Sequence, residues 1–297
     1  MIEVPTVLLL GAGASRDYGY PTGPELRDRI LKGLDDPDSM MHKQLESVGY
    51  DGDRARTFRL AFGRHQLPTI DQFLEEHPEF GPIGTVAIAC ALFPDEEIGR
   101  LERRPQMKWY DYLWDELRQD IKKFDDNELT IVTFNYDRSL EQYLGGALEV
   151  AGVEDVGERL SSLGFIHVYG TLGGIPYIDE GARKYGDTGD SLIVPAANAI
   201  NIIDRKDDKE LLKQFELAEK ALSEAKTIII LGFGYDATNV DRLDLREILI
   251  RGRAVRCLGT AWRIPAIRRN EIQRWIRGLN LVDGNCLDMF HDHFGFK

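Results

Sequence analysis

The sequence predicts an α/β protein with a Rossmann-like, doubly wound parallel sheet and a helical insertion after the first helix. Short apolar runs alternate with amphipathic segments of helical length along most of the 297 residues, which is typical of a parallel sheet covered by helices on both faces. The first apolar run ends in a glycine-rich turn that precedes a helical pattern. Residues 36–126 contain helical patterns without a clear strand, which indicates an insertion.

Several apolar runs have the length and composition of strands buried on both faces. A weaker run precedes Pro195. The expected strands are Thr6–Leu10, Leu129–Thr133, Phe165–Val168, Lys226–Leu231 and Ala254–Leu258, with Ser191–Val194 as the weaker one.

Helical patterns separate these runs, and further ones fill the insertion. Between the strands they cover Pro24–Leu34, Arg138–Val150, Asp208–Ala225, Val240–Ile250 and Pro265–Arg277. In the insertion they cover His42–Val48, Arg54–His65, Asp71–His77, Ile83–Phe93 and Met107–Phe124. We therefore expect one Rossmann-like domain made of residues 1–35 and 127–297, with residues 36–126 as a helical cap beside its ligand site.

The composition argues against several classes of protein. The formal net charge is −13, without long basic runs, so a nucleic-acid backbone would be repelled and we expect no direct nucleic-acid partner. No window approaches the ~18 apolar residues of a membrane span. The N-terminus enters a strand pattern without the features of a secretory leader. We therefore expect a cytoplasmic protein that does not bind membranes.

Cysteines and histidines form no recognisable metal motif. Cys90, Cys257 and Cys286 are isolated in the sequence, which argues against a disulfide framework and a thiolate zinc site. His291-Asp292-His293 has no further ligand cluster nearby in sequence and is interpreted as surface residues. The sequence therefore predicts no metal site.

The turn after the first strand, Gly11-Ala12-Gly13-Ala14-Ser15, indicates a nucleotide ligand. Glycines allow the backbone to approach a ligand closely, and the amides and positive dipole of a helix N-terminus favour a phosphate. The usual dinucleotide fingerprint has a third glycine three residues after the second, but Arg16 stands there. This difference weakens the interpretation as an ordinary NAD-dependent dehydrogenase.

Four strand ends carry unusual residues at the edge of the sheet where doubly wound folds bind ligands. Besides the glycine turn, they are Thr133-Phe134-Asn135-Tyr136-Asp137, the segment from His167 to Gly173, and Leu231-Gly232-Phe233-Gly234-Tyr235-Asp236. We expect these loops to converge on one pocket shaped for an adenine dinucleotide.

In these segments the chain resembles the prokaryotic sirtuin-like NAD hydrolases, many of which are antiphage-defence effectors. The matching segments occur in the family's order across nearly the whole chain. They are the Gly11–Ser15 turn, Gly19-Tyr20-Pro21-Thr22, Thr133–Asp137, His167–Gly170 and Leu231–Gly234, with Thr69–Leu74 similar to a segment in the family's insertions. The resemblance implies a sirtuin-like NAD-binding domain that uses NAD as a substrate and needs no other cofactor.

The resemblance also implies which residues bind NAD. Asn135 and Asp137 would lie at the nicotinamide ribose and carboxamide, and Gly232 and Gly234 would face the adenosine half. Phosphate and ribose contacts would come from Gly11, Ala12, Gly13, Ala14 and Ser15. The predicted NAD-binding residues are completed by Pro21, Thr22 and Gly259.

Two departures argue against the protein-deacylating sirtuins. Those enzymes have an Asp-Phe-Arg after the proline of the first loop, whereas here Pro21 is followed by Thr22-Gly23-Pro24. They also carry a four-cysteine zinc module, which three isolated cysteines cannot supply.

The histidine position differs as well. In deacylating sirtuins the catalytic histidine directly precedes a glycine, and here Tyr169 precedes Gly170. His167 lies two residues earlier. Because side chains two apart on a strand share a face, we expect His167 to reach the pocket, with Tyr169 complementing it.

The predicted reaction is hydrolysis of NAD to nicotinamide and ADP-ribose. Asn135 would hold the water and the ribose, and His167 would accept a proton near neutral pH. Asp137 would hydrogen-bond the carboxamide and offset the developing cation. Such an enzyme needs a trigger, so the resemblance implies homo-oligomerisation or an activating partner such as a hexameric ATPase.

Other interpretations stay open. The first is a non-catalytic sensor that binds NAD or an ADP-ribose derivative and signals through assembly. The second is a protein deacylase, and the third is an NAD-using dehydrogenase. Single residues also have structural interpretations: Asn135 as a helix cap, Asp137 as an acid near a helix start that is favoured by the helix dipole, and His167 as a hydrogen-bonded structural histidine. The aromatic residues of segment 109–114 indicate core or oligomer contacts rather than base stacking.

Overall fold

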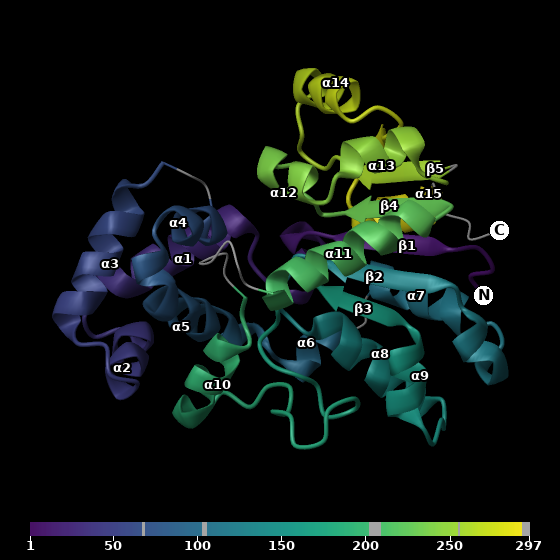
Figure 1. Ribbon diagram of the computed structural model, residues 1–297. Coiled ribbons are helices and arrows are strands. Elements are labelled where there is room, and N and C mark those ends of the chain that lie inside the picture. Colours follow the sequence, from purple (N-terminus) through teal and green to yellow (C-terminus); the bar gives the residue numbers. More distant parts are fainter. Residues whose placement is uncertain (67–68, 103–105, 202–208, 255, 293–297) are drawn as a thin grey trace.

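The computed structural model describes residues 1–66, 69–102, 106–201, 209–254 and 256–292. Its centre is a six-stranded sheet of order β3-β2-β1-β4-β5-β6, in which every neighbouring pair is parallel (Figure 1). The strands are β1 (Thr6–Leu10), β2 (Leu129–Thr133), β3 (Gly164–His167), β4 (Thr227–Leu231), β5 (Arg256–Thr260) and β6 (Asn280–Val282). The predicted α/β fold class is therefore confirmed, and the strand order reverses between β1 and β4.

The strand predictions hold for the five clear apolar runs and are wrong for the weak one. Ser191–Val194 lies across a short 3-10 helix and the start of α10 (Ile193–Asn198). Ile193, Ala196 and Ala197 are buried, which is the spacing of one helix face. A short apolar run does not distinguish a strand from a buried helix segment. The edge strand β6 was not predicted, because it has only three residues and is half exposed.

Helices cover both faces of the sheet. On one side α7 (Trp109–Leu117) contacts α8 (Ser139–Val150) and α15 (Cys286–Asp292). On the other side α11 (Lys209–Glu224) contacts α13 (Leu245–Arg251) and β3. The remaining helices of the sheet layer are α9 (Val156–Ser162), α12 (Ala237–Arg242) and α14 (Ala266–Trp275). The helix predicted over Val240–Ile250 is two helices, α12 and α13, because Asp244 adopts a left-handed conformation with φ of 46°.

A helical lobe lies beside the sheet, to the left in Figure 1. Its helices contact one another and are α1 (Gly23–Asp35), α2 (Met40–Ser47), α3 (Gly52–Arg64), α4 (Ile70–Glu76), α5 (Gly81–Leu92) and α10. The described part of segment 36–126 also includes α6 (Ile98–Glu102) and contains no strand. The packing thus groups α1 with the insertion helices.

Helix α7 from the end of segment 36–126 packs on the sheet layer. The Trp109 indole donates a hydrogen bond of 2.8 Å to the carbonyl of Ala14, and its ring stacks on Phe290 at 5.6 Å. Tyr110 stacks on Tyr18 at 3.6 Å. These aromatic side chains are core residues, as their helical spacing indicated. Across the described ranges, every helix is too short or too polar to span a bilayer.

Candidate functional site

The two glycine-rich loops, after β1 and after β4, lie directly against each other at the point where the strand order reverses. A Cβ at Gly11 or Gly13 would lie 2.7 or 2.8 Å from the carbonyl oxygen of Gly232, so only glycine allows this approach. The Gly11 amide donates to Leu231 at 2.9 Å and the Gly13 amide to Gly232 at 3.0 Å. These amides thus join the two loops.

Beside the loop after β1 lies a small buried cavity, which we call the inner cavity. It has a volume of about 10 Å³, which is about the space for the centre of one water molecule. Its lining comes from the ends of β1, β2 and β3 and from α7 and α8: Leu10, Ser15, Tyr110, Ile131, Thr133, Asn135, Asp137, Leu140, Glu141, Phe165 and His167. The structure thus brings together Ser15 and three of the four predicted catalytic residues.

Asn135 connects the first and second loops. Its side-chain amide donates to the Ser15 hydroxyl at 3.1 Å, and its backbone amide donates to the Thr133 hydroxyl at 3.0 Å. The Oδ1 atom is buried and accepts no hydrogen bond from the described residues. An unsatisfied buried acceptor is costly and rare. Asn135 therefore offers an acceptor to a water molecule or a substrate hydroxyl at this cavity.

Asp137 is buried and binds the first turn of α8. It accepts hydrogen bonds from the Ser139 amide at 3.1 Å and from the Ser139 hydroxyl. Burial raises the pKa of Asp137, hydrogen bonds from Ser139 and Ser15 oppose this, and the nearby Glu141 raises it further. Asp137 thus lies at the start of α8, as its structural interpretation expects, and also faces the cavity.

His167 pairs with Glu141, a residue that was not predicted as part of the site. Nε2 of His167 lies 2.6 Å from Oε1 of Glu141, and Nδ1 lies 3.5 Å from the carbonyl oxygen of Asn135. Burial lowers the pKa of His167, but the charge and hydrogen bond of Glu141 outweigh it and raise the pKa above 6.5. Sequence reasoning missed Glu141 because it lies in the first turn of α8, 26 residues before its partner His167.

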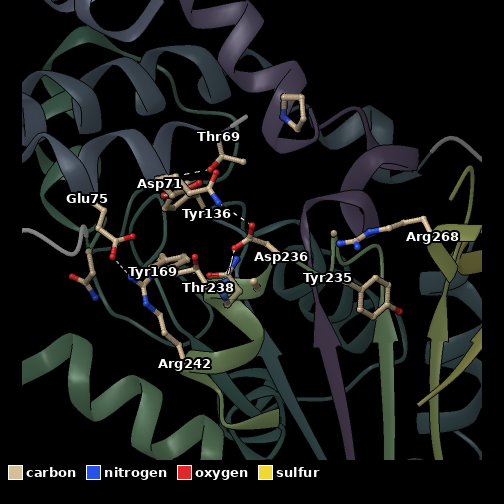
Figure 2. A pocket seen from close by; sticks show the side chains of 16 residues that line it. Thr69, Asp71, Glu75, Tyr136, Tyr169, Tyr235, Asp236, Thr238, Arg242 and Arg268 are labelled. Atoms are coloured by element: carbon tan, nitrogen blue, oxygen red, sulfur yellow. Dashed lines mark hydrogen bonds and ion pairs between the residues drawn. The ribbon is translucent and has the colours of Figure 1, made fainter. Parts of the chain in front are cut away.

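A much larger cavity, the rim pocket, opens at the carboxyl edge of the sheet beside α4. Its volume is about 460 Å³, within the range of small-molecule sites. It is lined by Pro24, Thr69, Asp71, Gln72, Glu75, Tyr136, Tyr169, Asn201, Gly234, Tyr235, Asp236, Ala237, Thr238, Asn239, Arg242 and Arg268. Figure 2 shows that labelled lining residues come from α4 (Asp71, Glu75), from the segments after β2, β3 and β4 (Tyr136, Tyr169, Asp236), from α12 (Thr238, Arg242) and from α14 (Arg268).

Helix α4 is tied to the sheet layer by polar contacts across the rim pocket (Figure 2). The Gln72 side chain donates to Asp236 at 2.9 Å. Tyr136 donates to Asp71, whose pKa is raised by burial. Glu75 forms an ion pair with Arg242 of α12. The segment Thr69–Leu74, noted for its resemblance to insertions, thus forms one wall of the pocket.

Tyr169 and His167 line different cavities. The Tyr169 hydroxyl donates to Asn239 at 2.7 Å and accepts from Arg242 at 2.9 Å, both on α12. Burial raises its pKa above the ordinary value of 10. Strand β3 ends at His167, and the chain then turns at Gly170 with φ of 71°. The extended spacing needed for a shared face therefore stops at His167, and Tyr169 does not complement it here.

Most of the other predicted NAD-binding residues lie outside both cavities. Gly234 lines the rim pocket. Thr22 caps α1 in a capping box with Glu25, whose carboxylate accepts from the Thr22 amide at 2.9 Å. Gly259 packs against the Tyr235 hydroxyl. Neither cavity is lined by Gly11, Ala12, Gly13, Ala14, Pro21, Thr22, Gly232 or Gly259.

The C-terminal histidine segment lies apart from both cavities. His291 is exposed, and its Nδ1 lies 2.6 Å from an oxygen of Asp292. His293 lies outside the described residues.

No protein-family model matches this chain, and no curated protein shows a significant sequence match.

Proposed function

We propose that this protein is an NAD glycohydrolase that releases nicotinamide and ADP-ribose by attack of water at C1′ of the nicotinamide ribose. The observation that supports it best is the convergence of Ser15, Asn135, Asp137 and His167 on one buried cavity the size of a water molecule. These side chains come from the ends of β1, β2 and β3, beside the switch point between β1 and β4, where doubly wound folds bind nucleotides. We propose NAD as the substrate because of the motif resemblance.

Each side chain has a task that its contacts support. The acceptor Oδ1 of Asn135 would position the water, while its amide stays bound to Ser15. His167, oriented by Glu141, would take the proton from the water. Asp137 would bind the carboxamide and offset the cation that develops on the ribose, an effect strengthened by the low dielectric of the site.

The inner cavity is too small for a nicotinamide ring. Productive binding therefore requires the loops after β1 and β2 to separate, and the hydrogen bond between Asn135 and Ser15 is where this opening would occur. We propose that opening is coupled to assembly into a homo-oligomer or to an activating partner such as a hexameric ATPase. In that case the enzyme would deplete cytoplasmic NAD only when triggered, as antiphage defence requires.

The test is release of nicotinamide from NAD by the purified full-length chain, followed by chromatography over a range of protein concentrations. Asn135→Ala should lower the rate about 10²–10³-fold, as loss of a preorganised polar group does. Asn239→Ala in the rim pocket is the matched control and should retain most activity. Equal losses in both variants would contradict the assignment of the chemistry to the inner cavity.

The second candidate is a non-catalytic sensor of NAD or an ADP-ribose derivative. The observation that favours it is the separation of the ligand-sized rim pocket from the inner cavity. Calorimetric titration with NAD and with ADP-ribose distinguishes the two. Binding without nicotinamide release at any protein concentration or oligomeric state would support the sensor.

A further inference from the structure

We propose that His65, Glu76 and His77 form a binding site for a divalent transition metal, for which Zn²⁺ is the best match. One ligand atom from each residue lies within 4.8 Å of the other two. Two imidazoles and one carboxylate are the ligand set of open zinc sites, in which water takes the fourth position. The proposal is independent of NAD cleavage.

The three residues meet because two helices of the lobe end at the same place. His65 is the C-cap of α3, Glu76 is the last residue of α4, and His77 is the C-cap of α4. Arg27 donates to the carbonyl of His65 at 2.8 Å. The His77 amide donates to Phe73 at 2.9 Å. The backbone that carries the ligands is therefore held in position.

The side chains combine a fixed ligand with two adjustable ones. His65 is 13% exposed, and its ring packs edge-on against Phe73 at 5.2 Å. Glu76 and His77 are 59% and 39% exposed, so both can rotate. Tetrahedral Zn²⁺ with bonds of about 2.0–2.1 Å needs ligand atoms about 3.4 Å apart. Nε2 of His65 and Oε2 of Glu76 are already 3.0 Å apart.

A neighbouring carboxylate supports the same interpretation. Oε1 of Glu79 lies 3.3 Å from Nδ1 of His77. Metal-binding histidines usually donate their other ring N–H to such a carboxylate, which fixes the tautomer and orients the ring. With Nδ1 of His77 held by Glu79, Nε2 is the atom presented to a metal. Glu76 and Glu79 together supply negative charge for a divalent cation.

The site lies on the helix that forms a wall of the rim pocket. Glu76 and His77 are at the C-terminal end of α4, and the N-terminal half of the same helix presents Asp71 and Gln72 to the pocket. A metal that joins the end of α3 to the end of α4 would hold this wall in place. A bound ion would thus stabilise the lobe.

The test is titration of chelator-treated full-length protein with Zn²⁺ in competition with a chromophoric indicator, in a non-coordinating buffer. We expect one equivalent to bind and the midpoint of thermal unfolding to rise, because the ion binds the folded state. His77→Ala and Glu76→Gln should each weaken binding at least tenfold. Glu79→Gln should weaken it about tenfold, as removal of an outer carboxylate does.

His291→Ala is the matched control, since His291 is also an exposed histidine beside a carboxylate. It should bind Zn²⁺ as the wild type does. Circular dichroism of each variant verifies that the fold is retained. The proposal is overturned if the wild type binds less than one equivalent, if His77→Ala binds with unchanged affinity, or if binding is lost in His291→Ala instead.

Discussion

The inner cavity and the rim pocket share one loop, yet they are built differently. Asn135 and Asp137 line the inner cavity, whereas Tyr136 between them lines the rim pocket. The inner cavity has room for one water molecule, and its polar groups are mostly bonded to one another. The rim pocket has ligand-sized volume and a wall from another part of the chain. This difference shows that the candidate catalytic side chains and the ligand-sized volume lie in separate cavities in this form of the protein.

The insertion is joined to the two regions by ion pairs of very different burial. Next to the inner cavity, Glu96 is fully buried and binds Arg138 at 2.9 Å and Arg183 at 2.5 Å. At the rim pocket, Glu75 pairs with Arg242, and the two side chains are 31% and 23% exposed. We therefore expect the contact of Glu96 with Arg138 and Arg183 to be rigid, and α4 at the rim pocket to move more easily.

The largest expected effect tests whether the chemistry is confined to the inner cavity. His167→Ala should lower nicotinamide release about 10²–10⁴-fold, because a positioned general base contributes that much. Tyr169→Phe, which removes only a hydroxyl in the rim pocket, should change the rate by less than about tenfold, since it removes one hydrogen-bonding group away from the base. Initial rates at saturating NAD measure both. A greater loss in Tyr169→Phe would reverse the assignment.

The next effect concerns stability. Glu96→Gln should lower the free energy of unfolding by about 3–5 kcal/mol, because it leaves two buried guanidinium groups without their counter-charge. Urea denaturation followed by circular dichroism measures the loss. Glu97→Gln is the control, since the Glu97 side chain is 49% exposed and its pair with Arg100 is near the surface. A loss below about 1 kcal/mol in Glu96→Gln would show that the buried pair does not anchor the insertion.

Glu141→Gln tests the pairing that raises the pKa of His167. A general base acts when deprotonated, so the acidic limb of the rate profile should lie above pH 6.5 in the wild type. Without the Glu141 charge, burial lowers the pKa, and the limb should move to lower pH. The rate at acidic pH should then increase severalfold relative to the rate at the plateau. An unmoved limb would separate His167 from the base function.

The same pairing predicts a pH dependence of stability. Because the folded pKa of His167 is raised, its stabilisation is fully present below the unfolded value of about 6.5 and is lost as pH rises through the folded pKa. Glu141→Gln should therefore be more destabilising at pH 5.5 than at pH 8.5. Urea denaturation at both values measures this, and equal losses would contradict it.

The smallest effect is expected at the rim pocket. Glu75→Gln should lower the free energy of unfolding by less than about 1 kcal/mol, because half-exposed ion pairs contribute little. Thermal unfolding of Glu75→Gln and Glu96→Gln, measured under the same conditions, compares the two losses of stability. A loss as large as that of Glu96→Gln would mean that the two regions are held equally firmly.

The strands and most helices could be predicted because the signal is local. A strand buried on both faces, such as β1 with every residue buried, requires a continuous apolar run, and that run is visible in the sequence. The turns after β1 and β4 were visible for a similar reason, since close backbone contact requires glycine. Both patterns depend on residues that are neighbours in the chain.

The partners of the site residues could not be predicted in this way. Nothing near His167 in sequence points to Glu141, and nothing near Tyr169 points to Arg242. Hydrophobic periodicity likewise does not predict that α1 packs in the helical lobe or that α7 packs on the sheet. It shows which face of a helix is buried, but not which surface that face covers. Each of these contacts joins segments that are distant in the chain.

The sequence by itself therefore determined the parallel sheet, the edge at which its loops meet, and the residues that line its strand ends. Only the tertiary structure decided that these residues divide between a water-sized cavity and a ligand-sized pocket. The physical reason is that backbone alternation is set within each strand, whereas the direction of a side chain beyond a strand end depends on where the chain turns. That turn, at Gly170, is stabilised by the Ala199–Asn201 segment packed against it.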